Sequence, residues 1–309
     1  MRYEADPAPA VDHSRHPAGT MTCPEQVATP EGFGDMAELQ DSSPLIDTPS
    51  LLAQRAHEEG CLLLRGLIPA ATVADARAGL LDTASRHGLL GKDAASVAEA
   101  QSDRWFDYYA DLTGCQDLYA LAWARPLQQT MRAVIADNAI VQPCGIFRIV
   151  SDRIRTEPKP PHQDARYVGT AADIWTAWIA CARCDGDTGG IAVMPQSHRD
   201  GMLDVHRVGN KNEVVVPEHL RWHGAVLEPG DVIIFSSYTI HRSVPGRRPA
   251  AVRLSADFRF QPADQPMRPE ACQPHLRLRD WEGIYAAWDA TRAPGRYYWR
   301  NPDLRLGVR

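Results

Sequence analysis

The sequence PPHQDARY, residues 160–167, places a histidine and an aspartate two residues apart. On an extended segment, residues i and i+2 point to the same face, so His162 and Asp164 could hold one ion together. The same His-x-Asp spelling also occurs in ordinary polar turns, and two ligands do not make a metal site. The choice between a metal site and a turn therefore depends on the sequence downstream.

A third candidate ligand stands 79 residues further on, in GDVIIFSSYTIHRSVPG, residues 230–246. The apolar run 232–235 predicts a strand, and His241 follows near its end. Two histidines and one carboxylate form the facial triad of non-haem Fe(II) oxygenases, which leaves three coordination positions open. The sequence thus contains one candidate set for iron.

An arginine follows in AAVRLSADFRF, residues 250–260, whose alternation predicts a strand with two unlike faces. The apolar face would carry Val252, Leu254, Phe258 and Phe260, and the polar face Arg253, Ser255, Asp257 and Arg259. An arginine that points into a barrel needs a partner. A dicarboxylate cosubstrate would supply one, because guanidinium binds carboxylate in a bidentate manner.

The predicted secondary structure changes from mainly helical to mainly β near residue 140. Helices are expected first, over residues 69–90 and 118–137, after a short strand at 61–64. Further strands are expected within residues 140–152, 172–184, 189–198, 231–237 and 250–260. Several short strands without intervening helices favour a sandwich or barrel over a parallel α/β sheet.

In these motifs the chain resembles the 2-oxoglutarate-dependent Fe(II) oxygenases, and more narrowly the phytanoyl-CoA dioxygenase family. The family's order of His-x-Asp, a distant His and then an Arg is matched by His162, Asp164, His241 and Arg253. The block WIACARCDGDTGGIAVMPQSH, residues 178–198, is similar to a second family motif, except that Gln stands where the family usually has Gly.

The resemblance implies a mainly β fold with bracing helices, around a double-stranded β-helix (jelly-roll, cupin-like) core. It implies Fe(II), 2-oxoglutarate as cosubstrate and O2. The implied reaction oxidises, most simply hydroxylates, a C–H bond of a small molecule and releases succinate and CO2. Desaturation, epoxidation and cyclisation stay open, but related halogenases have Ala or Gly in place of the aspartate, so Asp164 argues against halogenation.

The resemblance also implies further site residues. Trp178 and Ser243 fall where the family contacts 2-oxoglutarate, and Ser255 shares the face of Arg253. The candidates for the substrate pocket are Tyr167, Arg166, Trp105 and Tyr108. For these four, a solvated loop or an ordinary core position remains the competing interpretation.

Composition excludes several classes. The net charge is −6 and no block of basic residues occurs, so nucleic acid is not an expected partner. No run of 18 apolar residues and no Sec signal occur, so no membrane segment is expected. The seven cysteines are scattered; Cys181 and Cys184 read as buried thiols of a reduced, cytoplasmic protein, and Cys272 and His275 lack partners for zinc.

The expected organisation is a disordered leader over residues 1–40 and a single oxygenase domain over 41–309. Within the domain we expect a helical part at about 55–137, the jelly-roll core at about 140–262 and a C-terminal wrap at 263–309, which is rich in aromatics. Two function classes stay open: an iron oxygenase, for which a role in bacterial natural-product biosynthesis is one expectation, and a catalytically inactive jelly-roll protein with a binding or regulatory role. The sequence leaves the oligomeric state unknown.

Overall fold

A computed structural model describes residues 35–90, 105–153, 158–170, 173–208, 211–292 and 295–300. Residues 1–34 of the expected leader (1–40) lie outside the described residues. Its proposed end is corrected, because β1 (Ala37–Glu38) pairs with β9 (His223–Gly224) and Leu39 is buried. The ordered fold thus begins before residue 41.

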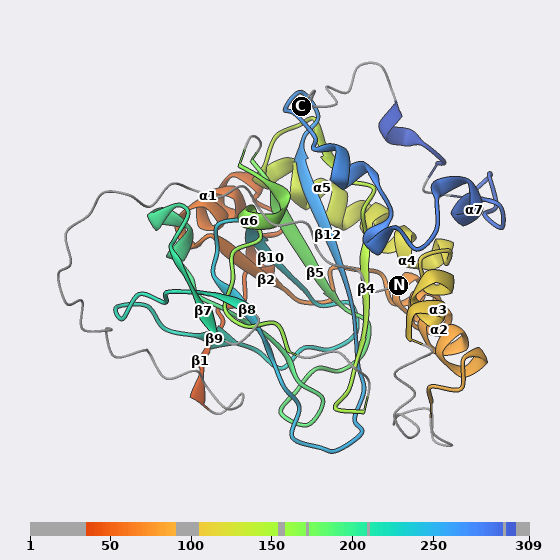
Figure 1. Cartoon of the computed structure of the whole chain (residues 1–309). Helices are drawn as coiled ribbons and strands as arrows, with labels where there is room; N and C mark the ends of the chain where they lie inside the picture. The colour runs from red at the N-terminus through yellow and green to blue at the C-terminus, as the bar shows by residue number, and fades with distance from the viewer. Residues whose placement is uncertain are drawn as a thin grey trace, which may run out of the picture.

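The larger sheet has six antiparallel strands. Its order is β2 (Cys61–Leu64), β10 (Val232–Ser236), β5 (Trp175–Ala180), β12 (Arg253–Pro262) and β3 (Ala139–Val141), and β4 (Ile146–Val150) also pairs with β12. All five of the strand regions expected after residue 140 contain a strand. β12 is the longest described strand of this sheet and lies between β5 and β4 (Figure 1).

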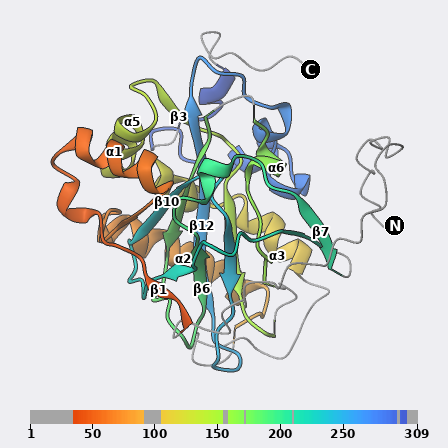
Figure 2. The ribbon, with the colours of Figure 1, turned by 90° about the vertical axis from the view of Figure 1, so that its left-hand side faces the viewer.

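The smaller sheet runs in the order β1, β9, β6 (Gly190–Val193), β11 (His241–Val244). A separate hairpin joins β7 (Val205–Val208) to β8 (Lys211–Val214). Ile191 and Val193 of β6 pack with Leu63, Ile233 and Phe235 of the larger sheet. Figure 2 shows this smaller layer in front of the larger sheet, so the expected jelly-roll sandwich with bracing helices is confirmed.

Strand alternation sorts the larger sheet into two faces, because successive side chains point to opposite sides. Leu254, Ala256 and Phe258 of β12 enter the core beneath the helices. The intervening face of β12 carries Arg253, Ser255, Asp257 and Arg259, which are all buried between the two sheets. The apolar and polar faces expected for residues 250–260 are therefore confirmed, and the polar face supplies the interior of the sandwich with charge.

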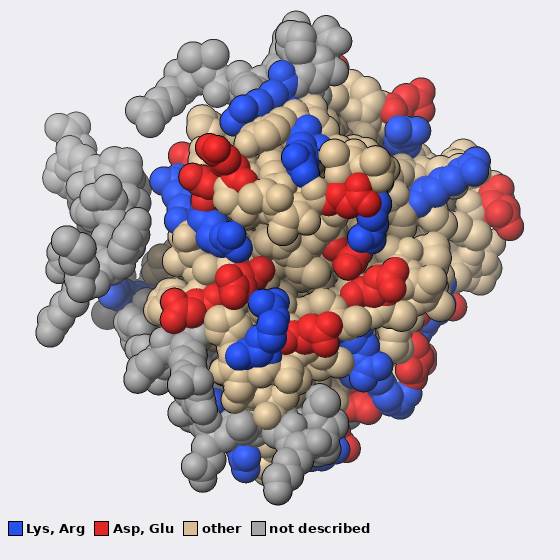
Figure 3. Space-filling model, turned by 90° about the vertical axis from the view of Figure 1, so that its right-hand side faces the viewer, with Lys and Arg blue, Asp and Glu red and all other residues tan. Residues whose placement is uncertain are grey.

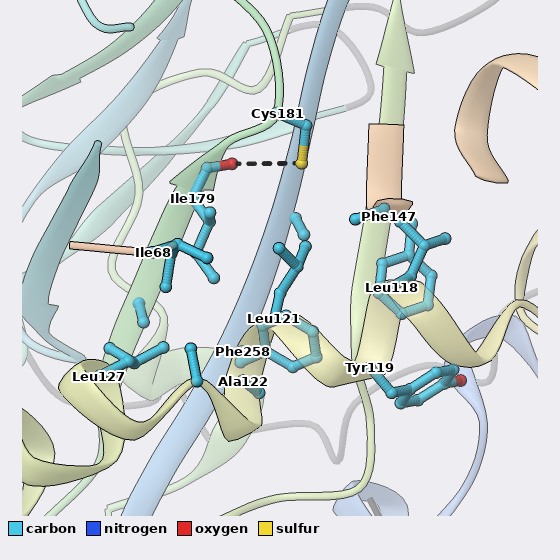
Figure 4. Close-up of a cluster of buried hydrophobic side chains, with 14 of the residues drawn as sticks. Ile68, Leu118, Tyr119, Leu121, Ala122, Leu127, Phe147, Ile179, Cys181 and Phe258 are labelled. Atoms are coloured by element: carbon cyan, nitrogen blue, oxygen red, sulfur yellow. Dashed lines mark hydrogen bonds between the residues drawn. The ribbon is translucent and has the colours of Figure 1, made fainter. Parts of the chain in front are cut away.

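Helices cover the outer face of the larger sheet, in contact with its apolar side chains (Figures 1 and 4). They are α1 (Pro49–Glu59), α2 (Ala70–Arg86), α3 (Trp105–Leu112), α4 (Gln116–Ala120) and α5 (Arg125–Val134). In Figure 4, Leu118, Leu121 and Leu127 lie on the same side of the sheet as Ile179 and Phe258. None of the described helices is both long enough and apolar enough to cross a bilayer.

Two helix predictions are corrected. The single helix expected over 118–137 is interrupted at Ala124, whose ψ of 125° is extended. The following Pro126 has no N–H to donate into a preceding turn, so the chain begins a new helix there. The helix α1 was missed, because only Leu52 and Ala56 are buried on it and its periodic signal is weak.

The remaining helical turns are short. They are α6 (Ala165–Val168), α7 (Trp281–Tyr285) and 3₁₀ turns at Ser43–Leu45, Leu121–Trp123, Ser197–Asp200, Pro269–Cys272, His275–Arg277 and Tyr298–Arg300.

Gln196, which stands where the resembled family has glycine, has a φ of 69°. That left-handed conformation favours glycine. Here the Gln196 N–H donates to the Glu59 carbonyl at 2.7 Å, which helps to hold the turn.

The aromatic C-terminal segment lies against the helices. Trp288 Nε1 donates to the Gly114 carbonyl at 2.9 Å, and Tyr298 Oη donates to the Val141 carbonyl at 2.9 Å. Trp281 and Trp299 are buried in the main core.

On the face of the molecule that carries α2, α3 and α7, basic and acidic side chains are interspersed, and neither sign dominates (Figure 3).

The packing of helices on the sheet yields a stability prediction. Phe258 is 1% exposed, so Phe258→Ala should lower the free energy of unfolding by about 3–5 kcal/mol. Leu51→Ala on α1, where the side chain is 49% exposed, should change it by less than about 0.5 kcal/mol. Urea denaturation followed by circular dichroism measures both. Equal losses in the two variants would contradict the described core.

Candidate active site

Two histidines that are far apart in the chain lie side by side in the fold. The His162 N–H donates to the His241 carbonyl and the His241 N–H donates to the His162 carbonyl, each at 3.0 Å. Their ring centroids are 4.1 Å apart. This reciprocal backbone pair joins the segment before α6 to the start of β11. The predicted strand is β10, and His241, which follows it in the sequence, is the first residue of β11.

Each imidazole is oriented by its backbone. His162 Nδ1 lies 2.8 Å from the Pro160 carbonyl, and His241 Nδ1 lies 3.1 Å from the Thr239 carbonyl. Because a carbonyl oxygen only accepts, each Nδ1 must carry the proton, and each Nε2 is left with its lone pair. Burial lowers the pKa of His162 to about 3 and also lowers that of His241. Both rings are therefore neutral at pH 7, the form that ligates metal.

The carboxylate of Asp164 completes the group. Its Oδ1 lies 3.8 Å from His162 Nε2 and 3.7 Å from His241 Nε2. Its Oδ2 accepts from Thr176 Oγ1 at 2.8 Å and from Arg259 Nη2 at 2.9 Å. Burial alone would raise the pKa of Asp164, but the paired Arg259 guanidinium and the hydrogen bond from Thr176 lower it well below its usual value. One oxygen is thus held by the protein, and the other faces the imidazoles.

The turn that carries Asp164 is also held by hydrogen bonds of the preceding residue, Gln163. Gln163, which is fully buried, donates through Nε2 to the carbonyls of Gly201 and Tyr238 and accepts at Oε1 from the Leu203 N–H. The predicted extended conformation is found at His162, which forms a β-bridge with His241, but it does not continue to Asp164. Asp164 already has helical dihedrals as the residue before α6, so its side chain reaches the histidines from a helix start.

The three predicted ligand residues offer two nitrogens and one oxygen within 4.8 Å of one another. No other such group of three or more metal-ligating residues occurs in the described part of the chain. This donor set is typical of non-haem Fe(II) sites, so the residues fit the metal that the sequence implied. Among the described residues, Cys272 and His275 belong to no such group, and His275 Nδ1 lies 2.5 Å from Tyr109 Oη.

Arg253 lies beside the triad with unused hydrogen-bonding capacity. Its Nη1 donates to the Gly190 carbonyl at 2.6 Å, and its Cζ lies 5.9 Å from the centre of the Trp178 ring. The Arg253 Nε and the Ser255 Oγ are buried and have no hydrogen-bond partner within the described structure. Burial lowers the pKa of Arg253 to about 10, so it is still charged at pH 7. A carboxylate is the ligand that such groups fit.

A small cavity links these groups to the triad. Its lining includes Trp178, Ser243 and Arg253 together with the two histidines. Ser255 itself does not line it but lies on β12 between Arg253 and Asp257, which both do. Three of the four residues expected at the cosubstrate, Trp178, Ser243 and Arg253, thus line the same cavity as the two histidines.

A second cavity of about 850 Å³ opens from the triad. Trp105, Tyr108 and Tyr167 line it, so three of the four substrate candidates are placed at its wall. The prediction that Arg166 belongs to the substrate pocket is wrong. Its guanidinium donates to the Leu203 carbonyl at 2.7 Å, and Arg166 lines neither cavity. Adjacent residues of the short helix α6 point in different directions, and Tyr167 and Val168, but not Arg166, line the cavity.

Sequence reasoning missed two residues that act on the triad. Arg259 and Thr176 are directly paired across β12 and β5, and both contact Asp164 Oδ2. A signal for Arg259 was present, since it shares the polar face of Arg253. Thr176 was a single polar residue in an apolar run, and only the strand register shows where it points.

Curated relatives cover most of this chain. A Streptomyces exfoliatus protein described as 1-deoxypentalenic acid 11-beta-hydroxylase is 28% identical over 253 residues, which is 74% of this chain and 86% of the relative. A protein of the same description from Streptomyces arenae is 28% identical over 258 residues, with 75% and 86% coverage.

Solved structures also match. The crystal structure of the epimerase SnoN in complex with Fe3+, alpha ketoglutarate and nogalamycin RO is 19% identical, with a TM-score of 0.48 over 72% of this chain and 87% of that one. A family comparison also matches: residues 56–250, more than half of the chain, fit the model of phytanoyl-CoA dioxygenase (PhyH). These residues include the triad. The chain therefore belongs to the phytanoyl-CoA dioxygenase family of iron- and 2-oxoglutarate-dependent oxygenases.

Proposed function

We propose that this protein hydroxylates a C–H bond of a small molecule, with Fe(II) held by His162, Asp164 and His241. The observation that carries the proposal is the orientation of these three side chains. Both Nε2 lone pairs and Asp164 Oδ1 face a common point, while the remaining polar atoms are held by the protein. Bound Fe(II), with 2-oxoglutarate and O2, supplies the oxidising power and yields succinate and CO2.

The chain's own residues supply position. Thr176 and Arg259 hold one carboxylate oxygen, so Asp164 would hold the metal through its other oxygen, and a set of three protein ligands would leave positions for cosubstrate and O2. An aspartate at this position also occupies the place that a halide ligand would need. Hydroxylation, or another oxidation of a C–H bond, is therefore the proposed outcome.

Arg253 is assigned to the distal carboxylate of 2-oxoglutarate, with Ser255 as a second donor. Both present buried, unpartnered hydrogen-bonding atoms on one face of β12. An unpaired buried donor is costly, so a bound carboxylate would stabilise both groups. Ser243 and Trp178 are assigned to the wall of the same subsite, since both line the smaller cavity.

The substrate is assigned to the cavity of about 850 Å³, a volume that suits a compact small molecule. Trp105, Tyr108 and Tyr167 would form part of its wall. The curated relatives act on 1-deoxypentalenic acid, which supports a role in bacterial secondary metabolism. We place the protein in a reducing compartment such as the cytoplasm, because the six described cysteines are all free.

One experiment separates this proposal from a catalytically inactive binding protein. The protein is loaded anaerobically with Fe(II) and 2-oxoglutarate, exposed to O2 with and without candidate small molecules, and assayed for succinate. We expect one iron per chain and iron-dependent succinate, which increases with a substrate. Absence of both iron binding and succinate would overturn the proposal.

The ligand assignment predicts specific losses. His162→Ala, Asp164→Ala and His241→Ala should each lower iron-dependent succinate formation by at least about 100-fold, since second-sphere changes alone cost 10–100-fold. The exposed His219→Ala serves as the matched control and should behave as wild type. Iron content and thermal unfolding are measured in parallel. An iron-loaded, active Asp164→Ala protein would contradict the triad.

The cosubstrate assignment is tested most cleanly at Ser255. Because its hydroxyl has no partner in the protein, Ser255→Ala should leave stability unchanged and raise the 2-oxoglutarate concentration needed for half-maximal turnover by about tenfold. Ser42→Ala removes another buried, unpartnered hydroxyl far from the triad in sequence and should have no effect on that concentration. Equal behaviour of the two variants would refute the role of Ser255.

The positioning of Asp164 is tested at Thr176. Thr176→Val keeps the side-chain shape but removes the hydrogen bond to Oδ2, so iron affinity should fall by about tenfold or more. Thr113→Val removes a partly buried hydrogen bond from a buried threonine to the Ala110 carbonyl in the helical layer and should leave iron affinity unchanged. Iron titration under anaerobic conditions measures both. A normal affinity in Thr176→Val would show that the hydrogen bond does not position the ligand.

A further inference from the structure

The large cavity has a charge opposite to that of the protein. The whole chain carries a net charge of −6. Among the described residues that line the cavity, the acidic ones are Asp164 and Glu270. The basic ones are Arg148, Lys159, Lys211, Arg253, Arg259 and Arg268. An excess of cations in a cavity within an acidic protein indicates a site for an anion.

Most of the arginines are already compensated. Arg259 pairs with Asp164 at 2.9 Å, and Arg148 pairs with Asp257 at 2.9 Å. Arg268 lies 3.4 Å from the Glu270 carboxylate. Arg253 is assigned to 2-oxoglutarate under the proposed function. Lys159 therefore carries a positive charge that remains for another ligand.

Lysine is rare in this chain, which makes its placement informative. The sequence contains 30 arginines but three lysines, Lys92, Lys159 and Lys211, and two of these line the same cavity. The backbone of Lys159 is fixed, because its carbonyl accepts from the Ser243 N–H at 3.0 Å. Lys159 precedes His162 by three residues, so its side chain starts near the candidate metal ligands.

The electrostatic surroundings of Lys159 agree with this placement. Partial burial and then the neighbouring Arg148 lower the pKa of Lys159, and Lys211 and Arg259 add to the effect. The acid that acts on it is Asp164, whose charge Arg259 already balances. His275, on the same cavity wall, has its pKa lowered to about 3 by burial and by Arg148, Arg259 and Lys159. Both groups thus experience a positive field.

We infer that the substrate is an apolar carboxylic acid whose carboxylate binds the Lys159 ammonium in the large cavity. The apolar part of the molecule would pack on the aromatic and aliphatic wall, which includes Trp105, Tyr108 and Ile146. A single ammonium is a point charge suited to one carboxylate, whereas the bidentate arginine forks are already engaged. The inference rests on the proposed function and adds the chemical class of its substrate.

The carboxylate at Lys159 could instead belong to 2-oxoglutarate, because Lys159 also lines the smaller cavity. Arg253 and Ser255 favour the substrate as its source, since their unpartnered atoms already provide for the cosubstrate. The experiment therefore measures both ligands. It uses the full chain loaded anaerobically with Fe(II) and 2-oxoglutarate, and a panel of linear, monocyclic and polycyclic carboxylic acids, each paired with the primary alcohol of the same skeleton.

In the wild type, calorimetry should show acids of the panel binding at least about tenfold more tightly than their alcohols. Lys159→Met should remove this preference, and Lys159→Arg should restore most of it. Arg77→Gln, at an exposed position on α2, should leave the preference unchanged. The 2-oxoglutarate concentration for half-maximal succinate formation should be the same in Lys159→Met as in the wild type.

Two results would overturn the inference. One is a wild-type protein that binds no acid of the panel more tightly than its alcohol. The other is a Lys159→Met protein that keeps the acid preference but needs about tenfold more 2-oxoglutarate, which would make Lys159 a cosubstrate residue. Iron-dependent succinate formation is recorded throughout. If succinate formation persists while the preference for acids is absent, the substrate class is wrong but the proposed function stands. If acids bind but no iron-dependent succinate forms, the proposed function is wrong, although the acid-binding site is present.

Discussion

The reciprocal backbone hydrogen bonds between His162 and His241 are the interaction on which the site depends. They join two segments that are 79 residues apart and fix the imidazoles side by side, before any side-chain contact is considered. Each ring then donates from Nδ1 to a carbonyl two residues upstream, which directs Nε2 inward. A carboxylate two residues beyond His162 completes the group, and backbone geometry thus determines the tautomer and direction of both nitrogen ligands.

The interior of the sandwich holds charges that a simple apolar core would exclude, and burial of charge is costly unless each group is paired. Asp164 pairs with Arg259 and Asp257 pairs with Arg148, so these two carboxylates are compensated within β12 and its neighbours. Arg253 is different, because it has a carbonyl and an aromatic face but no carboxylate. Its charge is balanced only when an anion binds, which is the physical basis for assigning it to 2-oxoglutarate.

Much of this arrangement was predictable from the sequence, and the part that was not has a definite physical origin. The alternation of residues 250–260 predicted both faces of β12, because both are buried and the pattern has a period of two. The contact of Thr176 with Asp164 was not predictable, since it depends on the pairing of Thr176 with Arg259 across two strands. Arg166 was misplaced because the direction of a side chain on one helical turn depends on the exact start of that turn.

The most direct test of the account is a crystal structure of the anaerobic Fe(II) and 2-oxoglutarate complex, with data collected at the iron absorption edge. We expect one anomalous peak in contact with His162 Nε2, His241 Nε2 and Asp164 Oδ1, with Asp164 Oδ2 still hydrogen-bonded to Thr176 and Arg259. We also expect that a carboxylate of 2-oxoglutarate meets Arg253. An iron peak elsewhere, or coordination through Oδ2 with Arg259 displaced, would contradict the account.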